Sequence, residues 1–130
     1  MRNLSFVALF LLLSASCASL DDARVANRSK LINLSPGMSR ADVLRVMGTT
    51  PMQVHDSNNM STVNNPYRTE MYTKGDDHIE IIYYYTDIKA ADNAITDDEL
   101  TPLVLKNGRL DGWGWTYLRD VATKYEIRLR

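Results

Sequence analysis

The sequence predicts an α+β fold in which two short N-terminal helices pack on an antiparallel sheet of three to four strands. The clearest helix signals lie before Pro51. Residues 78–86 are almost continuously β-branched or aromatic, as in a buried strand. Asn107-Gly108 is typical of a two-residue hairpin turn. Helices followed by an antiparallel meander form a two-layer domain, in which the helices cover only one face of the sheet.

Two helices are expected before the sheet. The first would end at Pro36-Gly37, and its apolar side would be formed by Val25, Leu31, Ile32 and Leu34. The second begins after Ser39, a good N-cap residue, with Asp42 at the position of a capping box. Gly48 is suited to end this helix. Its apolar face comprises Val43, Leu44, Val46 and Met47. A helix this short needs to pack against the sheet for its stability.

Four strands are expected after the helices, at residues 67–73, 78–86, 100–106 and 110–117. A turn at residues 74–77 and the Asn107-Gly108 turn connect neighbouring strands. Two polar stretches, 55–66 and 87–99, are predicted to be loops. Pro102 has no backbone N–H to donate, so it indicates an edge position or an irregular start for its strand.

The N-terminus predicts a bacterial export signal over residues 1–16. Arg2 precedes an apolar stretch at 4–13, and small residues lead to Cys17, the only cysteine of the chain. About 20 apolar residues are needed to cross a bilayer as a helix, so this stretch is too short to be a membrane span. Ser14-Ala15-Ser16-Cys17 resembles the lipobox of bacterial lipoproteins, which implies cleavage before Cys17 and acylation of its thiol. The alternative is a secreted protein that is cut after Ser16 or Ser19 without a lipid.

Composition and length indicate one small domain that does not bind nucleic acid. The formal net charge is −1, whereas a nucleic-acid-binding domain presents a basic face. After the signal at 1–16, residues 17–28 are expected to be a lipid-anchored tether, 29–118 the folded domain and 119–130 a C-terminal extension. The extension is expected to be a short helix or a final extended segment.

A motif around the second helix carries a family resemblance. It consists of Gly37-Met38-Ser39, Val43, Met47-Gly48 and Pro51, and it resembles the helix motif of the SmpA/OmlA (BamE-like) lipoprotein family. The resemblance implies two helices on a three-stranded antiparallel sheet and a place in outer-membrane β-barrel assembly. Residues 96–104 and 108–114 resemble the Thr-Pro-Leu-Val and Gly-Trp-Gly stretches of a related branch of Gram-negative lipoproteins. In this class Ala18, where an aspartate would mark retention in the inner membrane, implies the periplasmic side of the outer membrane.

The sequence contains no pattern that indicates catalysis, a cofactor or a metal site. His55 and His78 lie in separate polar segments without the spacing of a catalytic triad or a zinc site. An acidic run of Asp92, Asp97, Asp98 and Glu99 could bind calcium, but a solvated loop with a capped turn is the favoured interpretation.

Aromatic residues on the expected strands form the candidate interaction surface, which comprises Tyr84, Trp113 and Trp115. Alternation places Trp113 and Trp115 on one face of their strand. If helices cover one face of the sheet, aromatic side chains remain on the other, where Tyr and Trp are frequent interface anchors. The alternative for Trp113 is a place in the hairpin core.

These observations predict a periplasm-facing outer-membrane lipoprotein that acts as a non-catalytic protein-interaction module. Its expected partners are the membrane, through the N-terminal lipid, and an envelope protein, in the assembly of the envelope or of β-barrel proteins. The alternative is a small inhibitor or ligand-binding lipoprotein, since similar helix-helix-sheet units occur in β-lactamase inhibitory proteins.

Overall fold

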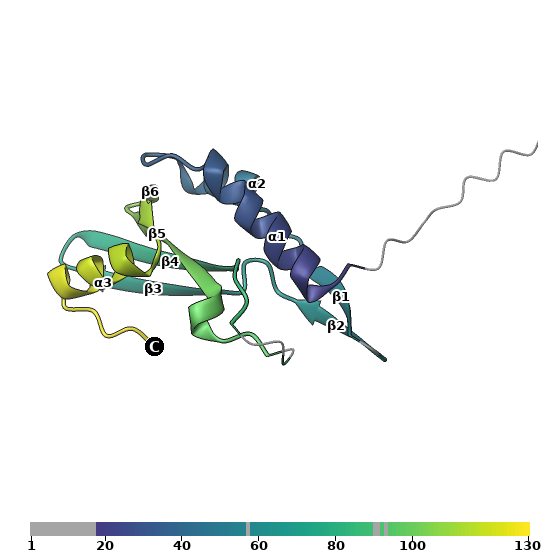
Figure 1. The fold of residues 1–130 in the computed structure, drawn as a ribbon. Coiled ribbons are helices and arrows are strands. Elements are labelled where there is room, and N and C mark those ends of the chain that lie inside the picture. Colours follow the sequence, from purple (N-terminus) through teal and green to yellow (C-terminus); the bar gives the residue numbers. More distant parts are fainter. Residues whose placement is uncertain (1–17, 57, 90–91, 93) are drawn as a thin grey trace, which may run out of the picture.

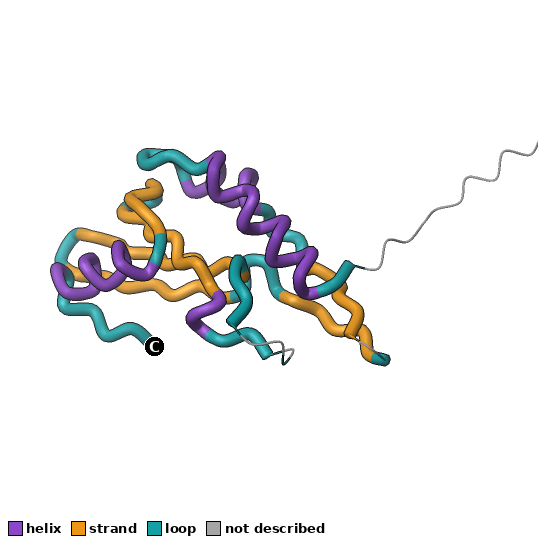
Figure 2. The backbone as a smooth tube through the Cα atoms, in the orientation of Figure 1, coloured by secondary structure: helices purple, strands orange, loops and turns teal. Residues whose placement is uncertain are grey.

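The computed structural model describes residues 18–56, 58–89, 92 and 94–130, so the predicted signal at 1–16 and Cys17 lie outside the described residues. The described part of the chain has an α+β fold, as predicted, with two antiparallel sheets where one was expected (Figures 1 and 2). Its elements are α1 (Leu20–Lys30), η1 (Leu31–Asn33), α2 (Arg40–Met47), β1 (Met52–Asp56), β2 (Asn59–Val63), β3 (Arg68–Lys74), β4 (Asp77–Tyr85), η2 (Asp97–Glu99), β5 (Leu100–Lys106), β6 (Arg109–Trp113) and α3 (Trp115–Lys124).

The larger sheet is an antiparallel meander in the order β3-β4-β5-β6, as expected, but both of its faces are covered. Its two sides belong to separate apolar clusters. One cluster joins the sheet to α2 through Val43, Met47, Ile82, Tyr84, Leu103, Leu105 and Leu110. The other joins it to α3 and the C-terminal tail through Ile79, Ile81, Tyr83, Val104, Leu118, Val121 and Ile127. The expectation of an open sheet face is therefore wrong, because α3 forms a third layer.

Helix α3 replaces the end of a predicted strand. The last strand, expected at 110–117, ends at Trp113 because Gly114 adopts a φ of 94° and the chain turns into α3. Leu118 and Val121 on this helix are buried against the sheet. The predicted domain boundary between residues 118 and 119 thus falls within α3. Residues 119–130 belong to the folded domain, first as helix and then as a tail whose Ile127 is buried.

Helix α1 occupies most of the predicted tether at residues 17–28. Ser19 caps this helix, and its side chain exchanges hydrogen bonds with Asp22 in a capping box. The buried Asn27 amide donates to Asn65 Oδ1 (3.1 Å) and to the Tyr85 carbonyl (2.9 Å). The first helix was expected to start within this stretch, and it begins at Leu20. Because α1 is fixed to the domain in this way, residues 20–28 are part of the folded domain and not of a tether.

A β-hairpin lies where a loop was predicted at 55–66. Strands β1 and β2 pair with each other from Met52↔Val63 to Asp56↔Asn59. Val54 and Val63 are buried in a small cluster with Ala23 of α1. Figure 1 shows this hairpin at one end of the molecule, beside the start of α1. Its polar composition does not indicate a strand, since Val54 and Val63 are the buried residues among its described side chains.

The motif at residues 37–51 shapes α2 and covers the edge of β6. The Ser39 side chain accepts from the Asp42 N–H (3.1 Å), and Gly48 ends α2 with a φ of 91°, as predicted. Val43 is buried in the core and Pro51 comes directly before β1. Gly37 N–H donates to the Leu110 carbonyl (2.7 Å) and Leu110 N–H donates to the Met38 carbonyl (2.8 Å). The segment before α2 therefore covers the outer edge of the sheet.

Two predictions concern β5 and the turn that follows it. Asn107 (φ 50°) and Gly108 (φ 78°) form the hairpin turn between β5 and β6, as predicted. Pro102 is not at an edge, because β5 lies between β4 and β6. The Pro102 carbonyl accepts from Gly114 N–H (2.8 Å). The nitrogen of Pro102 points to the same side as its carbonyl, beyond the end of β6 at Trp113. The strand tolerates proline there because no ladder bond is lost.

Candidate functional site

Tyr84 is a core residue and not part of an interaction surface. Its ring is fully buried in the cluster with α2, and its hydroxyl donates to the Gly48 carbonyl (2.8 Å). Burial raises the pKa of Tyr84 to about 12. This tyrosine joins the centre of the sheet to the end of α2, so its predicted exposure is wrong.

The two tryptophans lie on opposite sides of the sheet. Trp113 packs against the cluster that contains α2, whereas Trp115 packs against the cluster that contains α3. The strand alternation that predicted a common face stops at Gly114, where the helical geometry of α3 begins. Both side chains are half-buried. Trp113 thus follows the predicted alternative of a hairpin-core residue, and Trp115 borders two surface hollows.

Trp115 separates two adjoining hollows. Its ring packs at 5.9 Å from the Tyr83 ring, and its Nε1 donates to the Leu100 carbonyl (2.8 Å). A hollow of about 340 Å³ lies toward α1, and one of about 460 Å³ lies toward α3. Lys89, Asp98 and Trp115 line both of them. We call the two hollows the Trp115 surface; its other main residues are Arg28, Asp87, Leu100, Thr101 and Arg119.

Charges of both signs form the rim of the Trp115 surface. Asp87 pairs with Lys89 (2.8 Å) and lies 3.7 Å from the Arg28 guanidinium of α1. The bond from Lys89 lowers the pKa of Asp87, and the same contact raises the pKa of Lys89. The backbone N–H of Lys89 also donates to the buried Glu99 carboxylate (2.8 Å). The rim beside Trp115 is therefore connected to α1 through Arg28 and to η2 through Glu99.

The acidic run adopts the structure of a capped turn. Glu99 Oε2 accepts from the Thr96 N–H (2.8 Å), which completes a capping box around η2. Asp97 pairs with Arg68 of β3 (2.8 Å). Within the described ranges, no group of three or more His, Cys, Asp or Glu side chains is placed to hold a metal ion.

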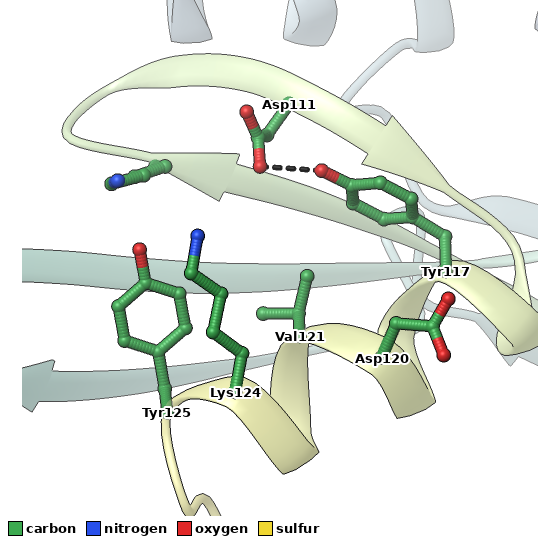
Figure 3. Close-up of a pocket in the computed structure, with 7 residues that line it drawn as sticks. Asp111, Tyr117, Asp120, Val121, Lys124 and Tyr125 are labelled. Atoms are coloured by element: carbon green, nitrogen blue, oxygen red, sulfur yellow. Dashed lines mark hydrogen bonds between the residues drawn. The ribbon is translucent and has the colours of Figure 1, made fainter.

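Apart from the two hollows of the Trp115 surface, a pocket of about 260 Å³ lies between the β5–β6 hairpin and α3 (Figure 3). We call it the α3 pocket. The buried Val121 lies at its centre, with Tyr117 and Tyr125 on either side, as Figure 3 shows. The Tyr117 hydroxyl donates to Asp111 of β6. The remaining lining residues are Lys106, Asp120 and Lys124.

Two ammonium groups flank Tyr125 in the α3 pocket. Lys106 Nζ lies 5.5 Å and Lys124 Nζ 5.4 Å from the centre of the Tyr125 ring, within the range of cation–π attraction. The Tyr125 hydroxyl, followed by Asp77, raises the pKa of Lys106. Burial, followed by the bond to Asp111, raises the pKa of Tyr117 to about 12. The pocket thus presents positive charge at one end and a carboxylate–phenol pair at the other.

The two histidines lie apart from both sites. His55 is exposed on β1, where its backbone N–H donates to the Ala18 carbonyl (3.0 Å). His78 is exposed at the start of β4, and its Nδ1 lies 3.2 Å from the Thr73 hydroxyl. Among the described side chains, no carboxylate forms a hydrogen bond or ion pair with either ring that would orient it as a general base.

Sequence reasoning missed the residues that α3 contributes. Trp115, Leu118, Val121, Ala122 and Tyr125 recur at helical spacing, which is the signal that could have revealed the helix. Because 110–117 was assigned to one strand, these residues were divided between that strand and the C-terminal extension. As a result Arg119, Tyr117 and Lys124 were not considered as surface or pocket residues.

No helix in the described part of the chain is both long and apolar enough to cross a bilayer.

Comparison with known proteins identifies the family. A family model described as a protein of unknown function, DUF3192, matches residues 14–120, and the chain therefore belongs to this family. No curated protein and no solved structure matches the chain.

Proposed function

We propose that this member of the DUF3192 family is a lipid-anchored outer-membrane protein that faces the periplasm and binds an envelope protein without catalysis. The observation that carries the proposal is the Trp115 surface. A tryptophan fixed by packing on Tyr83 and by a bond to Leu100 stands between two hollows with charged rims. A pre-ordered aromatic side chain loses little rotamer entropy on binding, which is why such residues are frequent binding anchors.

The proposed location depends on the N-terminal sequence. Cys17 follows an apolar stretch and small residues, and the segment resembles a lipobox. Ala18 after it, and the resemblance of residues 37–51 to the SmpA/OmlA family, support the outer membrane and a role in envelope or β-barrel assembly. Acylation at Cys17 with two or more chains would make the anchor stable.

Crosslinking from the Trp115 surface tests this proposal. A photoreactive amino acid in place of Arg119, in the acylated protein within intact envelopes, should form an adduct with one envelope protein. The same probe in place of Arg45, an exposed arginine on α2, is the matched control and should not form it. Lys89→Glu should reduce the Arg119 adduct about tenfold, because it reverses a charge that both hollows share. Equal adducts from positions 119 and 45, or an adduct insensitive to Lys89→Glu, would contradict the proposal.

A second candidate function, that of a ligand-binding lipoprotein, is favoured by the α3 pocket. Two ammonium groups beside the Tyr125 hydroxyl would bind a carboxylate or phosphate group, and Asp111 would accept a hydrogen bond from the ligand. A ligand of this kind should raise the unfolding temperature of the wild-type protein but not that of Lys124→Ala. Lys74→Ala, at an exposed lysine on β3, is the control that should respond like the wild type.

A further inference from the structure

The folded domain begins directly beside the predicted anchor. Ala18 follows Cys17 in the sequence, and its carbonyl accepts from the His55 N–H of β1 (3.0 Å). Ser19 then caps α1. One residue spans at most about 3.6 Å, so no flexible spacer separates Cys17 from the hairpin. An acyl group on Cys17 would therefore bring this end of the domain against the bilayer.

The hairpin at this end has an uncharged polar outer face. The register pairs Gln53 with Thr62 and His55 with Met60, and these four side chains share the face that points away from Val54 and the small core with α1. The Gln53 amide and the Thr62 hydroxyl bond to each other (3.0 and 3.2 Å). Met60 is 64% exposed.

Charge is scarce around the hairpin. Residues 49–67 contain no Lys, Arg or Glu, and Asp56 is their only Asp, in a chain with 24% charged residues. The two acidic side chains nearest the anchor on α1 have local partners. Asp21 pairs with Arg24 (2.7 Å), and Asp22 is engaged in the capping box with Ser19. An outer face that carries no Lys, Arg, Asp or Glu and exposes an apolar side chain suits the boundary between headgroups and acyl chains.

We infer that the outer face of the β1–β2 hairpin lies against the phospholipid headgroups and positions the domain on the membrane. This inference rests on the proposed acylation of Cys17. Ala18 neighbours His55, and His55 pairs with Met60 on the next strand. Two strand spacings amount to about 10 Å, so Met60 lies within about 10 Å of Ala18 and within reach of the interface. The occupant is the bilayer itself, because Ala18, the residue after the predicted lipid attachment site, is bonded to β1 of this hairpin.

Two exposed methionines provide a matched test. Acylation of Cys17 removes the only native thiol, so Met60→Cys and Met71→Cys each introduce a unique labelling site. Met71 is 74% exposed on β3 of the other sheet. Each variant carries an environment-sensitive fluorophore, and the full-length acylated protein is reconstituted in phosphatidylethanolamine and phosphatidylglycerol vesicles. The label at position 60 should shift its emission to the blue, and spin-labelled lipids should quench it at least threefold more than the label at position 71. Thr62→Cys, on the same face, should behave like Met60→Cys.

The outcomes separate the inference from the proposed anchor. Mass spectrometry of the purified protein reports acylation independently of the fluorescence. An acylated protein whose labels at positions 60 and 62 are quenched no more than that at 71 would overturn the hairpin inference and leave the anchor in place. A blue shift without quenching by spin-labelled lipid would indicate protein contact and would also overturn it. A protein without acyl chains would overturn both the anchor and the inference.

Discussion

The contact between Gly112 and the Tyr117 ring allows a quantitative test of how α3 packs on the sheet. A Cβ added at Gly112 would lie 2.7 Å from Cε1 and Cζ of Tyr117, against an ordinary contact of at least 3.4 Å. The ring would have to withdraw by about 0.7 Å, although its hydroxyl is bonded to Asp111 and its helix begins at Gly114. Overpacking of this kind costs about 1–3 kcal/mol.

An opposing effect is smaller. Gly112 has no positive φ, so alanine fits its backbone, and the loss of freedom in the unfolded chain stabilises the protein by about 0.4–1 kcal/mol. The net expectation for Gly112→Ala is a loss of about 1–2 kcal/mol, measured by urea unfolding. In a Tyr117→Ala background the clash disappears, and the same substitution should be neutral or slightly stabilising. Gly112→Ala that is neutral in the wild type, or equally harmful in both backgrounds, would refute this reasoning.

Two further predictions concern buried polar groups. Tyr84→Phe should lose about 1 kcal/mol at pH 8, because the Gly48 carbonyl loses its donor. Burial raises the pKa of Tyr84 to about 12, whereas a tyrosine in the unfolded chain has a pKa of about 10. The contribution of Tyr84 to the free energy of unfolding is therefore fully present below pH 10 and is lost as the pH rises toward 12. Tyr84→Phe should therefore lose less stability than the wild type between pH 9 and pH 11.5, and parallel curves would contradict this. Arg40→Leu removes the cation that binds the nearly buried Glu80 carboxylate through Nε (2.8 Å) and should cost about 2 kcal/mol. The double variant Arg40→Leu/Glu80→Leu should recover most of that loss, and a double variant no more stable than Arg40→Leu would argue against an unpaired charge as the cause.

The parts of the fold that could be predicted depend on single residues with strict backbone roles. Ser39 begins α2 because its side chain accepts an otherwise unpaired N–H, and Gly48 ends it with a positive φ. Asn107 and Gly108 both adopt positive φ in the hairpin turn. Such roles are local, so they can be inferred from neighbouring residues alone. The aromatic run in β4 was equally informative, because few other elements bury so many consecutive side chains.

The wrong predictions arise where tertiary packing determines burial, or where the side-chain period changes from that of a strand to that of a helix. Alternation was extended through Gly114, although its positive φ converts a period of two into one of 3.6 and sends Trp113 and Trp115 to opposite faces. Tyr84 was assigned to the open face of the sheet, whereas it lies on the face that α2 covers. The opposite face, which carries Tyr83, is covered by α3. The β1–β2 hairpin had little signal, since Val54 and Val63 are the buried residues among its described side chains. The candidate surface consequently retained one of its three predicted residues.

Helix α1 connects the predicted anchor to the Trp115 surface without a hinge. It begins at Leu20, beside Ala18, and its Arg28 lies on the rim of that surface. Asn27 fixes the helix to the end of β4, and Lys30 Nζ donates to the Met47 carbonyl at the end of α2 (3.2 Å). At 1.5 Å per residue, Arg28 lies about 12 Å along the helix axis from Leu20. With Cys17 acylated, the Trp115 surface would stay close to the bilayer, within reach of a partner that lies at the membrane.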